Sequence, residues 1–226
     1  ERVERLTTDE YVLSVEVLGR HRNRLRPGHH AGNRFRLVVR NPADHAGRTV
    51  PLVLQMLRER GVPNYFGPQR QGRRGDNYQV GAELLADEAR RQKMSRAKRM
   101  WYVNSLQSHL FNQILARRLD RLDRVFAGDW AMKTENGACF LVESAEQEQP
   151  RADRFEISPT GILFGSRVSW ADGDPGLIER TVVNENGMTP EGLTQAAKAC
   201  GFRGERRPLR VRLDGIEWAL DDNVLT

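Results

Sequence analysis

One short segment combines residue types that bind phosphates with residue types that stack on bases. The sequence GVPNYFGPQRQGRRGDN, residues 61–77, contains four glycines, two adjacent aromatic residues and three arginines. Glycines let backbone amides approach an anion closely because no Cβ intervenes, and the arginines bring positive charge to the same place. The rings of Tyr65 and Phe66 can stack on unpaired bases, a contact worth about 1–3 kcal/mol per base. Aromatic residues interleaved with arginines favour RNA as the ligand of this segment, which we call the opening loop.

The composition of the opening loop supports a second interpretation equally well. A solvated turn whose two aromatic rings pack inward would also use glycines and arginines. The sequence contains no G-x-x-x-x-G-K-[ST] motif, the signature of an NTP-binding loop, so we predict no nucleotide cofactor.

A second basic segment lies nearer the start of the sequence. Residues 20–40 contain seven arginines, three histidines and no acidic residue. A solvated loop could carry this charge, but the lack of any carboxylate favours contacts with phosphates. The histidines His21, His29 and His30 have no second cluster of cysteine or histidine to complete a metal site. We therefore predict no metal and place them at the surface or facing phosphates.

The composition of the whole chain is typical of a soluble protein that suits a polyanionic partner. Lys and Arg number 36 against 30 Asp and Glu, which gives a formal net charge of +6 and a pI near 9.8. Only Cys139 and Cys200 are present, so no disulfide framework is expected and a reducing compartment fits. No apolar run approaches the ~18 residues of a membrane span, and the first residues do not resemble a signal peptide. We predict a cytoplasmic monomer without a membrane partner.

Hydrophobic periodicity divides the chain into strands, a mostly helical block and strands again. Alternating apolar residues predict the strands, and apolar stripes at helical spacing predict the helices. We expect strands over 11–18, 35–39, 139–142, 159–165, 209–213 and 216–220, helices over 49–60, 79–90, 95–122, 175–184 and 190–200, and a polar link over 150–159. A helical block between strand-rich ends is typical of a domain inserted into a host whose ends lie close together. We place the insert at about residues 62–205.

Several motifs together resemble the TruD family of tRNA pseudouridine synthases. The pair GVPNYFGPQRQG and NSLQSHLFNQILARRL is similar to the family's paired signature, RHRNRLRPGHHAGNRFRLVVR resembles its basic loop and G-N-x-F strand, and SPTGILFG resembles a later turn. The resemblance covers nearly the whole chain in the family's order. It implies an α+β pseudouridine synthase catalytic fold, a mixed and mainly antiparallel sheet with helices, that is partial here and carries an inserted α/β TRUD domain. The implied domains are 1–61 in the catalytic domain, 62–205 as the insert and 206–226 as the return to the catalytic domain.

The resemblance also implies an activity and a set of site residues. The family isomerises uridine 13 of tRNA to pseudouridine: the uracil leaves C1′, turns and rejoins through C5, with an aspartate and no cofactor. The base must leave its stack, so by motif match Phe35 would be the aromatic platform of the active-site cleft and Asn33 its positioning residue. Without the family, a core ring and a strand-entry cap would be preferred for these two residues. The implied RNA-binding residues are Arg20, His21, Arg22, Arg24, Arg26, Tyr65, Phe66, Gln69, Arg70, Arg73 and Arg74.

Two departures from the family concern the catalytic machinery. The G-x-K-D-x-x-A-x-T-x-Q motif that carries the family's nucleophilic aspartate does not occur in this sequence, so we assign no catalytic residue. The family's F-x-L-P-x-G-S-Y-A-T-like strand is also absent, because the sequence stops at Thr226. A smaller departure is Gln71, where family members commonly have Phe. We expect a catalytic domain that is incomplete at both ends and a chain that is inactive by itself. The alternative is a non-catalytic or truncated protein that binds structured RNA.

Overall fold

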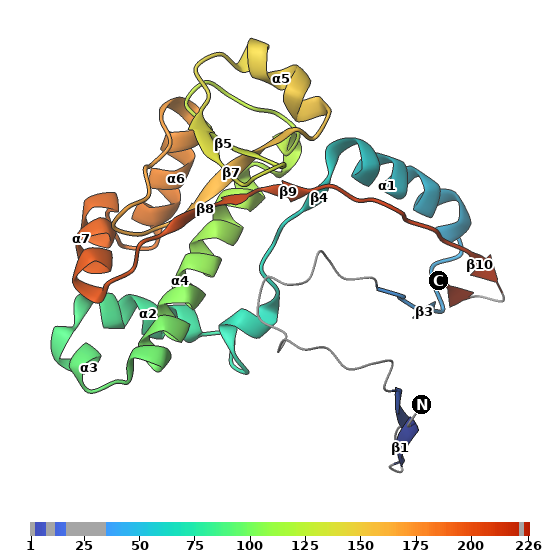
Figure 1. Cartoon of the computed structure of the whole chain (residues 1–226), viewed down its shortest axis with the longest axis horizontal. Coiled ribbons are helices and arrows are strands. Elements are labelled where there is room, and N and C mark those ends of the chain that lie inside the picture. The colour runs from blue at the N-terminus through green and yellow to red at the C-terminus, as the bar shows by residue number, and fades with distance from the viewer. Residues whose placement is uncertain (1–2, 8–11, 17–34, 222–223) are drawn as a thin grey trace. The chain divides into compact units, whose positions relative to one another are not determined.

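The computed structural model describes residues 3–7, 12–16, 35–221 and 224–226 (Figure 1). Contacts divide the chain into two compact units, Glu1–Pro42 with Trp218–Thr226 as the first and Ala43–Glu217 as the second. The domain boundaries expected at 61/62 and 205/206 stay a prediction. The two compact units do not show whether one domain is inserted into another.

The first unit consists of short antiparallel strands. Strands β1 (Val3–Thr7) and β2 (Val12–Glu16) form a hairpin, and a separate sheet has the order β10-β11-β3, with β10 (Leu220–Asp221), β11 (Val224–Leu225) and β3 (Val39–Arg40). The strand expected over 11–18 is confirmed by β2. The strand expected over 35–39 is much shorter, since only its last residue belongs to β3.

The second unit contains a four-stranded sheet of order β6-β5-β7-β8. Its strands are β5 (Trp130–Lys133), β6 (Cys139–Leu141), β7 (Ile157–Leu163) and β8 (Glu205–Pro208), and each pair is antiparallel. A separate antiparallel pair joins β4 (Val62–Pro63) to β9 (Arg210–Val211). Helices with antiparallel sheets confirm the α+β class.

Most helices of the second unit lie where the periodicity predicts them. The helical elements are α1 (Ala46–Arg60), η1 (Pro68–Gln71), α2 (Asn77–Ala86), α3 (Glu88–Gln92), α4 (Arg96–Arg117), η2 (Leu119–Arg121), α5 (Ala145–Asp153), α6 (Gly173–Glu185) and α7 (Pro190–Cys200). The helices expected over 49–60, 175–184 and 190–200 are confirmed. Gly201 ends α7 in the left-handed conformation that glycine adopts without strain.

Two expected helices have different ends. The helix expected over 79–90 is broken at Asp87, whose extended backbone ends α2 and whose carboxylate accepts a hydrogen bond from the Arg90 N–H as the N-cap of α3. The helix expected over 95–122 ends at Arg117.

The region after α4 also differs from expectation. The polar link expected over 150–159 is wrong: this stretch holds the end of α5 and the start of β7. Ser144 begins α5 by accepting a hydrogen bond from the Gln147 N–H, a capping signal that the charged composition of the stretch conceals.

Helix α4 forms the centre of the core of the second unit. One side packs with residues of α6 and α7, and another side packs against β7 and the segment between β8 and β9. The first cluster includes Val103, Leu106, Leu110, Ile114, Val182, Val183, Leu193 and Ala197, and the second includes Phe111, Leu115, Leu163 and Leu209. Trp101 and Leu119, two large apolar residues within the helix expected over 95–122, are exposed.

A buried ion pair joins β8 to α6. Arg206 donates from Nη1 to Glu179 Oε1 at 2.7 Å and from Nε to Thr160 Oγ1 at 3.0 Å. The second oxygen of Glu179 accepts the Ala171 N–H at 3.0 Å. Both charged side chains are almost fully buried, so each depends on the other for compensation of its charge.

A second buried pair lies at the end of α4. Arg118 donates from Nη1 and Nη2 to the two carboxylate oxygens of Asp129 at 2.9 and 3.0 Å. Asp129 also accepts the Phe126 N–H at 2.8 Å. The pair thus ties the end of α4 to the residue that precedes β5.

Breaking the Arg206–Glu179 pair should destabilise the second unit strongly. We expect Glu179→Gln to lower the free energy of unfolding by about 3–5 kcal/mol, because the guanidinium would stay buried without its counter-charge. Glu83→Gln, which removes the carboxylate of the exposed pair with Arg90, is the matched control and should cost less than about 1 kcal/mol. Urea denaturation of both variants measures the difference, and equal losses would contradict a structural role for the buried pair.

Candidate nucleic-acid interface

The structure describes only some of the predicted RNA-binding and cleft residues. Arg20, His21, Arg22, Arg24, Arg26 and Asn33 lie outside the described residues. Phe35 lies in the first unit, and 77% of its surface is exposed, so its ring is not packed in a core among the described residues. The opening-loop residues all lie in the second unit and form one local group.

The opening loop runs from β4 through the single turn η1 to the start of α2 (Figure 1). Gly72 has φ +73°, and a Cβ there would lie 2.6 Å from Asn77 Nδ2. Gly75 has φ +77° and space around it. Backbone conformation thus requires glycine at 72 and favours it at 75, independently of any anion.

Helix α4 anchors the loop through two polar side chains. Asn112 pairs with the backbone of Phe66 in both directions: its Oδ1 accepts the Phe66 N–H at 2.9 Å, and its Nδ2 donates to the Phe66 carbonyl at 3.0 Å. Ser105 Oγ donates to the Arg70 carbonyl at 2.7 Å, and Gln71 Nε2 donates to the Ser105 carbonyl at 3.1 Å. The loop conformation is therefore specified by the helix beneath it.

These anchors were missed by the sequence reasoning, although the motif that contains them was singled out. Ser105 and Asn112 are seven residues apart, so they lie two helical turns apart on one side of α4. Polar residues at that spacing within an otherwise buried helix are a signal of a loop docked on the helix, because buried polar groups require partners.

The two aromatic residues of the loop have different environments. Tyr65 is 42% exposed, whereas Phe66 is half-buried with its ring edge-to-face with Phe111 at 5.5 Å between centroids. Two guanidiniums lie over the Phe66 ring, those of Arg207 at 4.0 Å and Arg70 at 5.3 Å from the centroid. The exposed ring of Tyr65 therefore fits the interpretation as a stacking surface, and the ring of Phe66 fits the interpretation as inward packing.

The charged side chains of the loop face solvent. Gln69, Arg70, Arg73 and Arg74 are all exposed. Over the described ranges, none of these three arginines makes an ion pair with a carboxylate. Their charge is thus available to an anionic ligand. The described residues also hold no group of three or more His, Cys, Asp or Glu side chains that could bind a metal ion.

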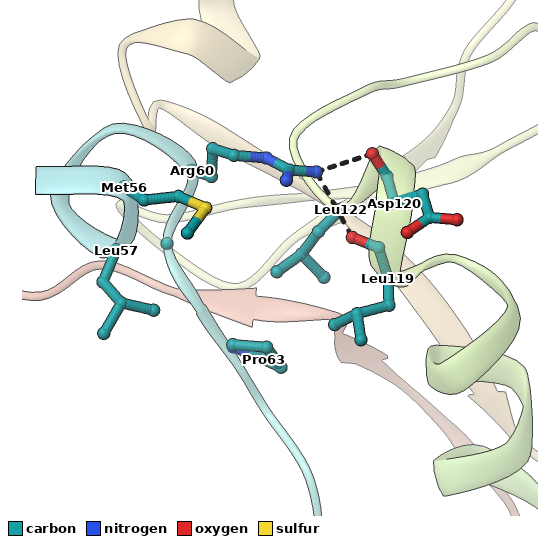
Figure 2. A pocket seen from close by; sticks show the side chains of 8 residues that line it. Met56, Leu57, Arg60, Pro63, Leu119, Asp120 and Leu122 are labelled. Atoms are coloured by element: carbon teal, nitrogen blue, oxygen red, sulfur yellow. Dashed lines mark hydrogen bonds between the residues drawn. The ribbon is translucent and has the colours of Figure 1, made fainter. Parts of the chain in front are cut away.

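A small pocket lies beside the start of the loop, between α1 and η2 (Figure 2). Its volume is about 200 Å³, and its lining is mostly apolar: Met56, Leu57, Gly61, Pro63, Leu119 and Leu122, with Arg60 and Asp120. Arg60 donates from Nη2 to the carbonyl oxygens of Leu119 and Asp120 at 3.2 and 2.6 Å, and from Nε to Asp123 at 3.0 Å. Arg60 thus fastens the end of α1 to the segment 119–123 beside the pocket.

Fold and site define an α+β protein whose cationic, aromatic loop is fixed on a buried helix. The family model of tRNA pseudouridine synthase D (TruD) matches residues 1–95 and 86–226. This match extends over the whole chain, and the chain belongs to the TruD family.

Two relatives and one solved structure illustrate the similarity. The tRNA pseudouridine synthase D of Geobacter sulfurreducens is 36% identical over 275 residues, with 95% of this chain and 66% of the relative covered. That of Thermus thermophilus is 41% identical over 204 residues, with 89% and 54% covered. The chain therefore spans about half to two thirds of these relatives' length. A crystal structure from Methanosarcina mazei, assigned to a candidate tRNA pseudouridine synthase D, shares the fold with a TM-score of 0.71 at 22% identity, covering 97% of this chain and 70% of that one.

Removing the Asn112 anchor should release the opening loop without unfolding the core. We expect Asn112→Ala to accelerate tryptic cleavage after Arg70, Arg73 and Arg74, because the Phe66 N–H and carbonyl lose their partner at a cost of about 1–3 kcal/mol. Asn104→Ala, on the same helix and without a side-chain hydrogen bond among the described residues, is the matched control. Cleavage rates measured by mass spectrometry that are equal in both variants would show that α4 does not fix the loop.

Proposed function

We propose that this chain acts in the isomerisation of uridine to pseudouridine in tRNA, with uridine 13 as the target. Membership of the TruD family supports the proposal, since the relatives above are tRNA pseudouridine synthases D. We further propose that the protein works as a monomer in the cytoplasm without a nucleotide cofactor. Within the described residues, no helix has the length and apolar character needed to span a membrane.

One observation carries the RNA-binding part of the proposal. The opening loop holds an exposed tyrosine and three exposed arginines on a backbone that α4 fixes, and within the described residues no carboxylate pairs with these arginines. Arginine contacts to phosphates would supply affinity and register, and the Tyr65 ring would offer a stacking surface to an unpaired base. A fixed loop loses little conformational freedom on binding.

The active-site assignments rest on motif match. Phe35 is proposed as the platform for the flipped uracil and Asn33 as its positioning residue. The exposure of Phe35 is compatible with this role. The residues Arg20, His21, Arg22, Arg24 and Arg26 are proposed to contact the tRNA backbone.

The chemical step requires an aspartate that the motifs of this sequence do not supply. We therefore propose that these residues contribute tRNA binding and base positioning. The nucleophile would be the aspartate of the family's G-x-K-D motif, which does not occur in this sequence. A non-catalytic protein that binds structured RNA is the second candidate, and the lack of that motif in the sequence favours it.

Incubation with an unmodified tRNA transcript tests the proposal. We expect the chain to bind tRNA with an affinity that falls steeply with salt, each phosphate contact adding roughly 0.7–0.9 to the log-log slope, and to form no pseudouridine by carbodiimide mapping. Pseudouridine in the product would mean that a carboxylate of this chain, such as Asp76, acts as nucleophile. A chain that does not bind tRNA at low salt would contradict both candidate functions.

A further inference from the structure

Arg207, on β8, joins the opening loop from the far end of the sequence. Its Nε and Nη2 donate to the Asn64 carbonyl at 3.3 and 3.2 Å, and Nη2 also donates to Asn64 Oδ1 at 2.6 Å. The guanidinium lies 4.0 Å from the centre of Phe66 and 5.5 Å from that of Phe111. Arg207 is thus held in one place by a loop residue and two rings.

One edge of this guanidinium remains available. Nη1 has no hydrogen-bond partner among the described residues, and it is not among the buried nitrogen atoms that lack one. In the part of the chain that the structure describes, Arg207 forms no ion pair, although its neighbour Glu205 stabilises its charge from a distance.

A second guanidinium, that of Arg70, lies at the same ring. Partial burial, and secondly the positive charge of Arg70, lower the pKa of Arg207. Placing two like charges around one half-buried ring destabilises the free protein, and no carboxylate among the described residues offsets it by an ion pair. An anion that contacts both guanidiniums would reduce this repulsion, and charge-assisted hydrogen bonds from arginine to phosphate are among the strong ones.

We propose that Arg207 and Arg70 together form a binding site for one phosphate group of the RNA backbone, at the Phe66 ring. Arg207 is the fixed half of the site and Arg70, on the exposed loop, is the adjustable half. The proposal rests on the proposed function, since it takes tRNA as the source of the phosphate. It adds a residue of β8 to the RNA-binding residues proposed above.

Filter binding of an unmodified tRNA transcript at several salt concentrations tests this site. We expect Arg207→Gln and Arg70→Gln each to weaken binding about tenfold or more at low salt. Because the two side chains share one phosphate, the slope of log affinity against log salt should fall in the double variant by the contribution of one phosphate, roughly 0.7–0.9. The loss of affinity in the double variant should also differ from the product of the two single losses. Arg207→Lys keeps the charge without the planar contacts and should bind with intermediate affinity at unchanged slope.

Arg154→Gln is the matched control, because it removes one exposed arginine that is already paired with Glu156; its affinity should equal that of the unmodified chain. Thermal melting shows whether each variant is folded. If Arg207→Gln does not fold, the test of the site rests on Arg70→Gln, which changes an exposed side chain. Salt-dependent binding by the original chain with no change in the variants would overturn this site alone. A slope loss equivalent to two phosphates in the double variant would also overturn it. Failure of the original chain to bind tRNA would overturn the proposed function and the site together.

Discussion

The second unit depends on the contacts of three arginines, Arg206, Arg207 and Arg210, within the returning segment of residues 205–211. Arg206 is buried on Glu179 of α6, and Arg207 points to the opening loop at Asn64. Arg210 donates from Nη1 to the Arg60 carbonyl at 2.9 Å and from Nη2 to the Ala152 carbonyl at 2.5 Å, with its guanidinium over Phe155. Figure 1 shows this segment running alongside β4. It thereby joins elements that are far apart in the sequence. A guanidinium suits this position because its five donors can satisfy several acceptors at once.

This arrangement explains how the candidate interface is positioned. The loop is held by Asn112 and Ser105 of α4 below and by Arg207 of β8 at its side, so its exposed arginines project from a fixed backbone. Phe66 packs inward against Phe111, whereas the ring of Tyr65 is exposed. Preorganisation of this kind lowers the conformational cost of binding an extended polyanion.

The resemblance of several motifs predicted the α+β class, and local glycine signals predicted the helices that end before Gly61 and Gly201. The sequence did not predict the break at Asp87 or the helix α5, whose caps lie within charged stretches that resemble loops. It also could not identify the contacts of Arg206, Arg207 and Arg210. Apolar residues alternating with arginines predicted a strand over 209–213, but in the structure Arg210 is buried and Val211 is exposed. The partners of the three arginines lie between 27 and 150 residues away, so only the tertiary structure brings them together.

Hydrogen–deuterium exchange of the chain with and without unmodified tRNA tests most directly whether the loop and the returning strand form one RNA-binding surface. The account predicts slower exchange on tRNA binding in residues 61–77 and 205–211 together, with little change in α6 and α7. Protection confined to other segments, with unchanged exchange in the opening loop, would contradict it.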